Sequence, residues 1–202
     1  MAVVLVVFCV FCLITKDQAS QADTDGDEIV IDLEKILGMD TSVKSVNALS
    51  YEEEYGIAYF EGTSAEDFAG ELCGQADGAE LTSSWQEDDL LVSVYSNDLY
   101  YIYVESDTGT DEIHYFQISI FDWEEAGENA DIFTAAMELL GYEYICENDE
   151  EGKESVSESL EGYVQEINDG NLSFTSIIVF DSSCVEFFTD ESGYPTCEVL
   201  AY

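Results

Sequence analysis

The sequence predicts an α+β fold in which helices pack against one or more antiparallel β-sheets. Several short segments are rich in aromatic and β-branched residues, such as LYYIYVE at 99–105, and favour strands. Other segments repeat apolar residues at helical spacing, as Val156, Leu160, Tyr163 and Ile167 do. The chain is also 47% hydrophobic and 13% aromatic, which indicates a packed core even though its charge is high.

Residues 1–22 are predicted to be a secretory signal peptide. The apolar run Ala2 to Ile14 is shorter than the roughly 20 residues that a membrane-spanning helix needs, and it fits the apolar part of a signal peptide. Ser20-Gln21-Ala22 supplies small residues for cleavage before Asp23. No Lys or Arg precedes the run, which favours either a start inside a longer leader or a eukaryotic leader. We expect a secreted or cell-surface protein, with an uncleaved membrane anchor as the alternative.

The chain after the leader is predicted to begin with an acidic linker at residues 23–27. A helix, a strand and a second helix follow, at 29–37, at 55–61 and from Thr63 or Ser64 onward. In the second helix, Phe68 and Leu72 are four residues apart and so share its inner face.

Residues 79–121 are predicted to form an antiparallel meander. Its strands are expected at 79–85, 90–96, 99–105 and 113–121. Asn97-Asp98 is typical of the tight turn that joins the second strand to the third.

The remaining residues are predicted to repeat this order of helices followed by strands. Helices are expected at 129–140 and 156–167, and strands at 142–146, 172–180, 184–188 and 196–201. The fragments EKILG (34–38) and MELLG (137–141) occupy similar places in the two parts. One globular body at 28–202, or two similar halves at 28–121 and 122–202, would both fit this order.

The chain is strongly acidic, with 46 Asp and Glu residues against four Lys, no Arg and a formal net charge of -42. Nucleic acids and anionic membrane surfaces are excluded as partners, because binding phosphates needs clustered basic residues. Cations, basic proteins and neutral glycans are the partners that such a surface favours. The other interpretation is that the charge only keeps an exported protein soluble.

The segment DTDGDEIVIDLE at 23–34 has the ligand spacing of a calcium-binding loop. The candidate metal ligands are Asp23, Asp25, Asp27, Ile29 through its carbonyl, and Glu34. These twelve residues resemble an EF-hand or dockerin-type loop, and the resemblance implies Ca²⁺ as a cofactor. Glu28 stands where the loop has glycine, and the leader takes the place of the entering helix. The composition of an acidic segment is the alternative explanation.

Four cysteines would remain after cleavage, namely Cys73, Cys146, Cys184 and Cys197. An exported chain with four cysteines can form two disulfides in three pairings. Cys184 and Cys197 flank a predicted hairpin and are expected to pair, which leaves Cys73 and Cys146 as the second pair. Buried free thiols are the alternative, and zinc is disfavoured because no CxxC spacing occurs.

No catalytic constellation stands out in the sequence. His114, the only histidine, is predicted to be a packed core residue on the same strand face as Phe116 and Ile118. We therefore predict an exported, non-catalytic binding or surface/matrix protein that responds to cations such as Ca²⁺. The alternative is a carbohydrate-binding or carboxylate-dependent glycoside-hydrolysing protein, with Trp85 or Trp123 beside two carboxylates in a cleft.

Overall fold

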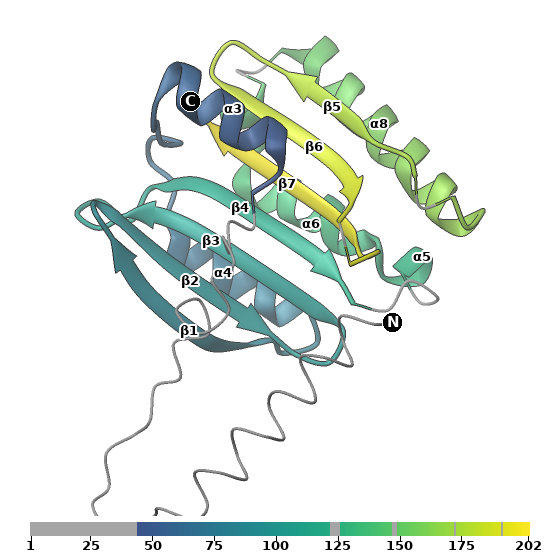
Figure 1. Ribbon diagram of the computed structural model, residues 1–202, viewed down its shortest axis with the longest axis horizontal. Coiled ribbons are helices and arrows are strands. Elements are labelled where there is room, and N and C mark those ends of the chain that lie inside the picture. The colour runs from purple at the N-terminus through teal and green to yellow at the C-terminus, as the bar shows by residue number, and fades with distance from the viewer. Residues whose placement is uncertain (1–43, 122–125, 147–148, 172, 191) are drawn as a thin grey trace, which may run out of the picture. The chain divides into compact units, whose positions relative to one another are not determined.

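The computed structural model describes residues 44–121, 126–146, 149–171, 173–190 and 192–202. They form a seven-stranded antiparallel sheet with the strand order β1-β2-β3-β4-β7-β6-β5 (Figure 1). The strands are β1 (Glu80–Glu87), β2 (Leu90–Ser96), β3 (Tyr100–Asp107), β4 (Ile113–Ile120), β5 (Ser176–Val179), β6 (Ser183–Thr189) and β7 (Pro195–Ala201). The predicted α+β fold class is confirmed.

Helices lie on both faces of this sheet. They are α3 (Val46–Tyr55), α4 (Ala65–Gln75), α5 (Ala126–Asn129), α6 (Asp131–Leu140), α7 (Tyr142–Ile145) and α8 (Glu150–Asn168). Figure 1 shows α3 in front of the sheet and α4, α6 and α8 behind it. Two meanders, β1 to β4 and β5 to β7, meet where their last strands, β4 and β7, pair in the middle of the sheet.

The main hydrophobic core lies between the sheet and helices α4, α6 and α8. Phe116, Phe133 and Tyr163 are among its largest fully buried side chains. The rings of Phe133 and Tyr163 have centroids 6.1 Å apart. The buried Tyr163 hydroxyl donates a hydrogen bond to the carbonyl of Phe188 and accepts one from the Thr196 amide at 3.0 Å. This core therefore fastens α8 to β6 and β7 by both apolar and polar contacts.

A helix cap and a tight turn that the sequence predicts are both present between residues 63 and 100. Ser64 is the N-cap of α4, and its hydroxyl accepts a hydrogen bond from the Asp67 amide at 3.2 Å. The Asn97 side chain accepts hydrogen bonds from the amides of Leu99 and Tyr100, at 2.9 and 2.8 Å, and so builds the predicted turn between β2 and β3.

Two predicted strands are wrong, and the helices α3, α5 and α7 were not predicted. Residues 55–61 were expected to be a strand, but Tyr55 ends α3 because Gly56, at φ 89°, caps the helix through its bond to the Glu52 carbonyl. Residues 142–146 were also expected to be a strand. They form α7 instead, since Gly141, at φ 97°, ends α6 and the Cys146 amide bonds back to the Tyr142 carbonyl at 2.9 Å.

The predicted disulfides are not formed in this fold. All four candidate cysteines are buried and free. Cys184 and Cys197 lie on adjacent strands, but Cys184 belongs to the cluster on the α3 side, whereas Cys197 lies in the main core on the other side. Because neighbouring strands share their two faces, side chains on opposite faces cannot bridge. Cys73 and Cys146 are likewise free.

The predicted leader at 1–22, the linker at 23–27 and the helix at 29–37 lie outside the described residues. Whether the chain holds one body or two similar halves stays a prediction. Within the described part of the chain, none of the helices has the length and apolar character required to cross a membrane.

Helix α8 contains one closely packed glycine, Gly152, and one open glycine, Gly162, and substitutions at the two positions should have opposite effects on stability. A Cβ added at Gly152 would meet Cys146 Cβ and Phe180 Cε1 at 2.9 Å, whereas at Gly162 it would meet nothing within 4 Å. We expect Gly152→Ala to lower the free energy of unfolding by about 1–3 kcal/mol through overpacking. Gly162→Ala should raise it by up to about 1 kcal/mol through helix propensity. Urea unfolding measures both, and equal effects would contradict this packing.

Candidate functional site

A groove of about 900 Å³ lies on the helix side of the sheet, lined by residues of α4, α6, α7 and α8. Its floor is apolar and buried, and is made by Phe68, Ile113, Leu140 and Leu160. Pockets of a few hundred to about 1,000 Å³ are typical of small-ligand and peptide-side-chain sites. The groove is therefore large enough to hold a ligand against an apolar floor.

The walls of this groove are acidic. Six carboxylate side chains line it, namely Asp67, Glu71, Asp131, Glu138, Glu143 and Glu161. Lys153 is the only basic residue among the described lining residues, and its ammonium lies 5.1 Å from the centroid of the Tyr142 ring. Several carboxylates around one cavity concentrate a negative potential there and attract cations. The position of Lys153 shows how a cation can rest on an aromatic wall of the groove.

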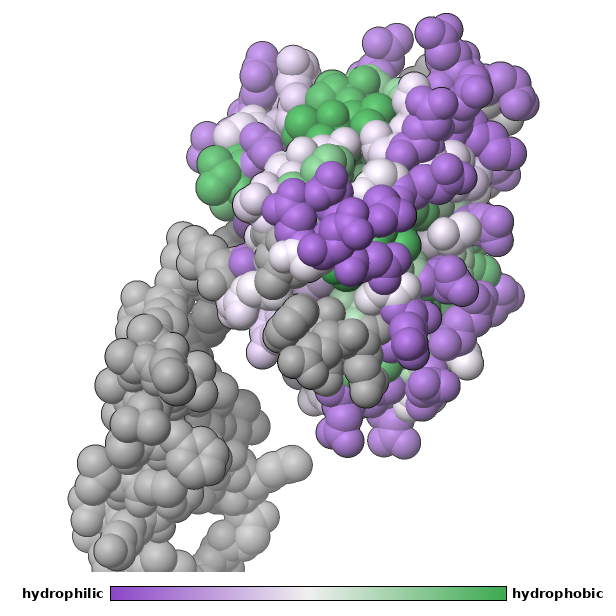
Figure 2. Space-filling model, turned by 90° about the vertical axis from the view of Figure 1, so that its right-hand side faces the viewer, coloured by the Kyte–Doolittle hydropathy of each residue, from purple (hydrophilic) through white to green (hydrophobic). Residues whose placement is uncertain are grey.

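The surface beside the groove is equally hydrophilic. Figure 2 shows the side of the molecule that bears β5 and α8, where hydrophilic residues cover most of the surface and hydrophobic residues form small separate areas. Most of the exposed positions of α8 between residues 150 and 161 are carboxylates or a lysine. A ligand that approaches the groove from this side therefore crosses a strongly anionic surface.

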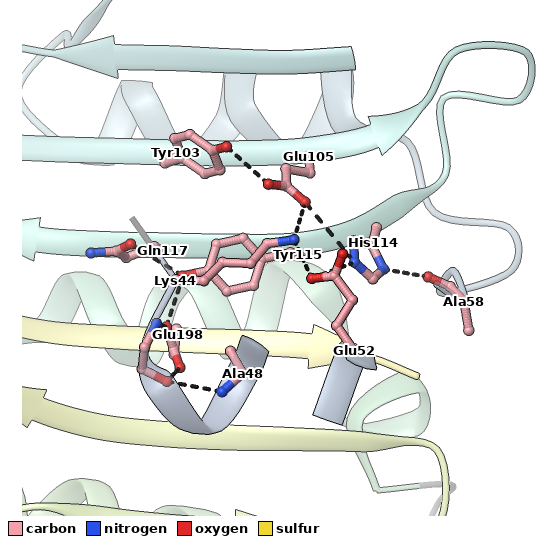
Figure 3. A network of polar contacts seen from close by, with 11 residues as sticks. Lys44, Ala48, Glu52, Ala58, Tyr103, Glu105, His114, Tyr115, Gln117 and Glu198 are labelled. Carbon is pink, nitrogen blue, oxygen red and sulfur yellow. Dashed lines mark hydrogen bonds and ion pairs between the residues drawn. The ribbon is translucent and has the colours of Figure 1, made fainter. Parts of the chain in front are cut away.

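A second concentration of polar groups lies on the opposite face of the sheet, beneath α3 (Figure 3). The Lys44 ammonium lies 2.6 Å from Glu52 Oε2 and 2.7 Å from Glu105 Oε2. The side chains of Lys44 and Glu105 are only 8% and 6% exposed. Tyr103 donates a hydrogen bond to the other oxygen of Glu105 at 2.8 Å. We call Lys44, Glu52, Glu105 and His114 the lysine cluster.

The predicted burial of His114 is confirmed, but the predicted strand face is wrong, because His114 belongs to the lysine cluster and does not share the face of Phe116. A β-bulge in the β3–β4 pairing places Tyr115 opposite Glu105 and Ile113 opposite Ser106, which turns His114 toward α3. The ring is fully buried, and its Nδ1 lies 2.7 Å from the Ala58 carbonyl. Since a carbonyl only accepts, Nδ1 carries the proton. Nε2 then points at Glu52 Oε2 and Glu105 Oε2, 3.9 Å from each.

The lysine cluster holds Glu52 in its ionised form. With a proton on Nε2 as well as on Nδ1, His114, and then Lys44, stabilise the carboxylate and, against the opposing effect of burial, lower the pKa of Glu52 from 4.5 to about 2. Because the pKa is lower in the folded chain than in the unfolded one, this contribution to stability is complete above pH 4.5. It is lost as the pH falls from 4.5 toward 2.

A third group of polar contacts joins the N-terminus of α3 to β6 and β7. The Ser45 hydroxyl caps α3 by accepting a hydrogen bond from the Ala48 amide at 3.0 Å. The same hydroxyl lies 2.9 Å from Glu186 Oε2 and in closer contact with Glu198 Oε1. Glu186 and Glu198 are directly opposite each other in the β6–β7 pair and are 3% and 1% exposed. We call Ser45, Glu186 and Glu198 the serine bridge.

Tyr115 connects the serine bridge to the lysine cluster. Its hydroxyl donates a hydrogen bond to Glu198 Oε2 at 2.7 Å, and its ring centroid lies 5.3 Å from the Lys44 ammonium. Burial, with the neighbouring Glu198 carboxyl, keeps the pKa of Tyr115 well above its usual value. The two groups of contacts therefore form one continuous polar layer between α3 and the sheet.

The predicted calcium ligands, Asp23, Asp25, Asp27, Ile29 and Glu34, lie outside the described residues. In the part of the chain that the structure describes, no group of three or more His, Cys, Asp or Glu side chains is placed to hold a metal ion. Trp123 also lies outside it. Trp85 is 41% exposed on the edge strand β1, packs edge-to-face on Tyr103 and does not line the groove.

Sequence reasoning did not identify the groove residues or the buried glutamates. The six groove carboxylates come from four separate helices, and each one alone has the pattern of a solvated helix face. Glu105, Glu186 and Glu198 alternate with apolar residues in their strands, which is typical of an outward strand face. The sequence does contain two residues that could have revealed α3. Ser45 is its N-cap, and Gly56 ends the helix at its C-terminus.

Comparison of the chain with protein-family models, with curated proteins and with solved structures finds no match among them. The function must therefore be inferred from the geometry and charge of the chain itself.

Proposed function

We propose that this chain is a non-catalytic binding protein whose groove between α4, α6 and α8 takes a cationic ligand, such as a basic segment of a partner protein. The observation that carries the proposal is the set of six carboxylates around a cavity with an apolar floor. Export, and a response to Ca²⁺ through residues 23–34, belong to the same proposal and rest on the sequence. Nucleic acids and anionic membranes remain disfavoured as partners because both are polyanions.

The lining of the groove supports binding over catalysis. Its titratable groups are carboxylates, Tyr142, Tyr144 and Lys153, and the described lining residues include neither His nor Cys. His114, the histidine of the chain, is buried in the lysine cluster on the other face of the sheet. The described lining therefore contains no Ser–His or Cys–His pair of the kind that nucleophilic catalysis commonly uses. Acidic walls and an apolar floor suit a side chain that has both a long aliphatic part and a positive end, as Lys and Arg do.

The proposal is tested by titrating the protein with an arginine-rich dodecapeptide in a calorimeter. Replacing Glu138, Glu143 and Glu161 together by Gln should weaken binding about tenfold, since each exposed ion pair contributes about 0.5 kcal/mol. The matched control replaces three acids of the β1–β2 hairpin, with Glu80→Gln, Glu87→Gln and Asp88→Asn. These three residues are exposed and lie outside the groove. The control removes the same charge and should change the affinity less than twofold.

Two results would overturn the groove as the binding site. Equal weakening by both triple variants would show that only the total charge attracts the peptide. No binding at 50 mM salt would show that the anionic surface takes no basic ligand, because electrostatic association strengthens as salt is lowered.

A neutral glycan is the second candidate ligand. Tyr142 and Tyr144 line the groove beside Glu143, and aromatic rings next to hydrogen-bonding groups are the combination that sugar rings contact. This candidate is distinguished from the first by salt. Binding of a neutral oligosaccharide would persist at 500 mM NaCl, whereas binding of the basic peptide would be lost.

A further inference from the structure

Helix α3 is attached to the sheet by polar side chains and by the stacking of Tyr51 and Tyr55 on Tyr202, whose ring centroid lies 5.0 and 4.9 Å from theirs. Ala48 is its only fully buried residue, while Tyr51 packs against the small apolar cluster that contains Cys184 and Leu200. The strong contacts are the serine bridge at the N-cap of the helix and the contact of Glu52 with Lys44 in the lysine cluster. Hydrogen bonds to titratable groups depend on the proton of each group, so this attachment depends on pH.

The serine bridge requires a proton on one of its two carboxyl groups. The Ser45 hydroxyl has a single hydrogen but contacts both Glu186 Oε2 and Glu198 Oε1, while it accepts the Ala48 amide. A hydroxyl can donate one hydrogen bond and accept two. The pattern is complete when Ser45 donates to one carboxylate and a protonated carboxyl group donates to Ser45.

The surroundings assign that proton to Glu198. Glu186 receives the Ser45 hydroxyl on Oε2 and the Asn47 side-chain amide on Oε1, both at 2.9 Å. Glu198 receives the Ser45 amide at 3.2 Å and the Tyr115 hydroxyl at 2.7 Å on Oε2, so its Oε1 is left facing the Ser45 hydroxyl and can carry the proton. Glu198 is the more buried of the two and faces Glu186 across the β6–β7 pair. Burial, reinforced by the Glu186 charge and only partly offset by hydrogen bonds from Ser45 and Tyr115, raises the pKa of Glu198 to about 7.

We propose that α3 is a pH-dependent latch over the sheet, closed while Glu198 donates its proton to Ser45 and released when that proton is lost. Without the proton, the carboxylates of Glu186 and Glu198 face each other across the Ser45 hydroxyl. Because this hydroxyl has one hydrogen to donate, one of the two carboxylates loses its hydrogen bond to Ser45. Release relieves this repulsion by admitting water to both groups.

The titratable groups that interact directly with the carboxyl groups of the serine bridge are Tyr115 on β4, Cys184 on β6 and Cys197 on β7. Tyr115 in turn faces Lys44 before α3 and Tyr103 and Glu105 on β3, which lead to Glu52 on α3 and His114 on β4 in the lysine cluster. Tyr202 at the C-terminus lies beside Cys184. Glu52 stays ionised throughout the range of the latch, since its pKa lies at about 2. His114 belongs to the lysine cluster beside these groups, so the test must separate an effect of His114 from that of Glu198.

The direction of the effect follows from the raised pKa of Glu198. Between pH 4.5 and about 7 the closed latch holds a proton that a released, solvated Glu198 has lost. The closed form therefore loses stability as the pH rises through this window, and the loss is complete above it. The opening equilibrium should rise on the order of a hundredfold between pH 5 and pH 8.5, because each unit of pKa corresponds to about a tenfold change.

Two buried thiols on opposite faces of the sheet report the opening. Cys184 lies in the apolar cluster that includes Ala48 of α3, whereas Cys197 is fully buried in the main core. While buried, both thiols are protected, and burial raises the pKa of Cys184 to about 12. Release of α3 exposes Cys184 alone, while unfolding of the whole sheet exposes both.

The test labels the full chain with 4,4′-dithiodipyridine from pH 5 to pH 8.5 and locates the modified cysteines by mass spectrometry. The ratio of the Cys184 rate to the Cys197 rate cancels the intrinsic pH dependence of thiol reactivity. We expect this ratio to rise on the order of a hundredfold with pH in the wild type. It should stay flat in Glu198→Gln, whose amide keeps a donor for Ser45.

A constant ratio in the wild type would overturn the latch. The same rise in Glu198→Gln would also overturn it, and would assign the pH dependence to another group such as His114. If Glu198→Gln does not fold, Glu186→Gln replaces it, because this variant also removes the repulsion between the two carboxylates and should reduce the rise. An undiminished rise in Glu186→Gln would equally contradict the proposal.

Discussion

Lys44→Met is expected to destabilise the protein by about 3–5 kcal/mol, because it leaves two carboxylates together without their cation. Lys44 is 8% exposed and contacts both Glu52 and Glu105 within 2.7 Å. Removing one partner of a buried ion pair leaves an uncompensated charge in a site from which water is largely excluded. The measurement is the free energy of unfolding in urea, followed by circular dichroism at pH 7.

Two further variants show whether the loss comes from unpaired charge. Lys153→Met removes the other described lysine, which is exposed and rests on Tyr142, and should cost less than about 1 kcal/mol. Lys44→Met combined with Glu52→Gln and Glu105→Gln removes the whole charge set and should recover most of the lost stability. A Lys44→Met loss below 1 kcal/mol, or a triple variant no more stable than Lys44→Met, would contradict the role given to the lysine cluster.

Phe133→Ala is expected to lower the free energy of unfolding by about 3–5 kcal/mol, the usual cost of deleting a buried aromatic side chain. Phe133 is fully buried on the inner face of α6 and packs on Tyr163. Stabilities of single domains are about 5–15 kcal/mol, so this is a large fraction of the total. Since α6 also carries Asp131 and Glu138 of the groove, its displacement should weaken peptide binding too.

Thr134→Ala is the matched control for Phe133→Ala. Thr134 follows Phe133 in α6 but lies on the side that lines the groove, and it is only partly buried. Its replacement should change the free energy of unfolding by no more than about 0.5 kcal/mol. Equal effects of the two substitutions in urea unfolding would show that α6 does not present Phe133 to the core.

Elements whose apolar pattern matches their burial were predicted from the sequence. The meander β1 to β4, the three helices behind the sheet and the hairpin of β6 and β7 all carry such a pattern. The apolar residues of helix α3 do not form one buried face, since Val46, Leu49 and Tyr55 are exposed, so hydrophobic periodicity did not reveal the helix.

The orientation of His114, the groove and the buried glutamates depend on contacts between residues far apart in the sequence, so local sequence patterns did not predict them. The bulge opposite Glu105 changes the face on which His114 lies, and no local residue pattern marks it. The groove gathers acids from helices that are up to about 90 residues apart, and only the tertiary fold brings them around one cavity. Buried glutamates look like surface residues in the sequence because burial depends on α3 and on its partners.

The anionic groove between α4, α6 and α8 is the ligand-binding site that we propose for this protein. The most direct measurement is amide hydrogen exchange, read by mass spectrometry, with and without the saturating arginine-rich dodecapeptide. We expect protection confined to α4, α6, α7 and α8, whose residues line the groove. Protection centred on the β1–β2 hairpin, or spread evenly over the acidic surface, would contradict the claim.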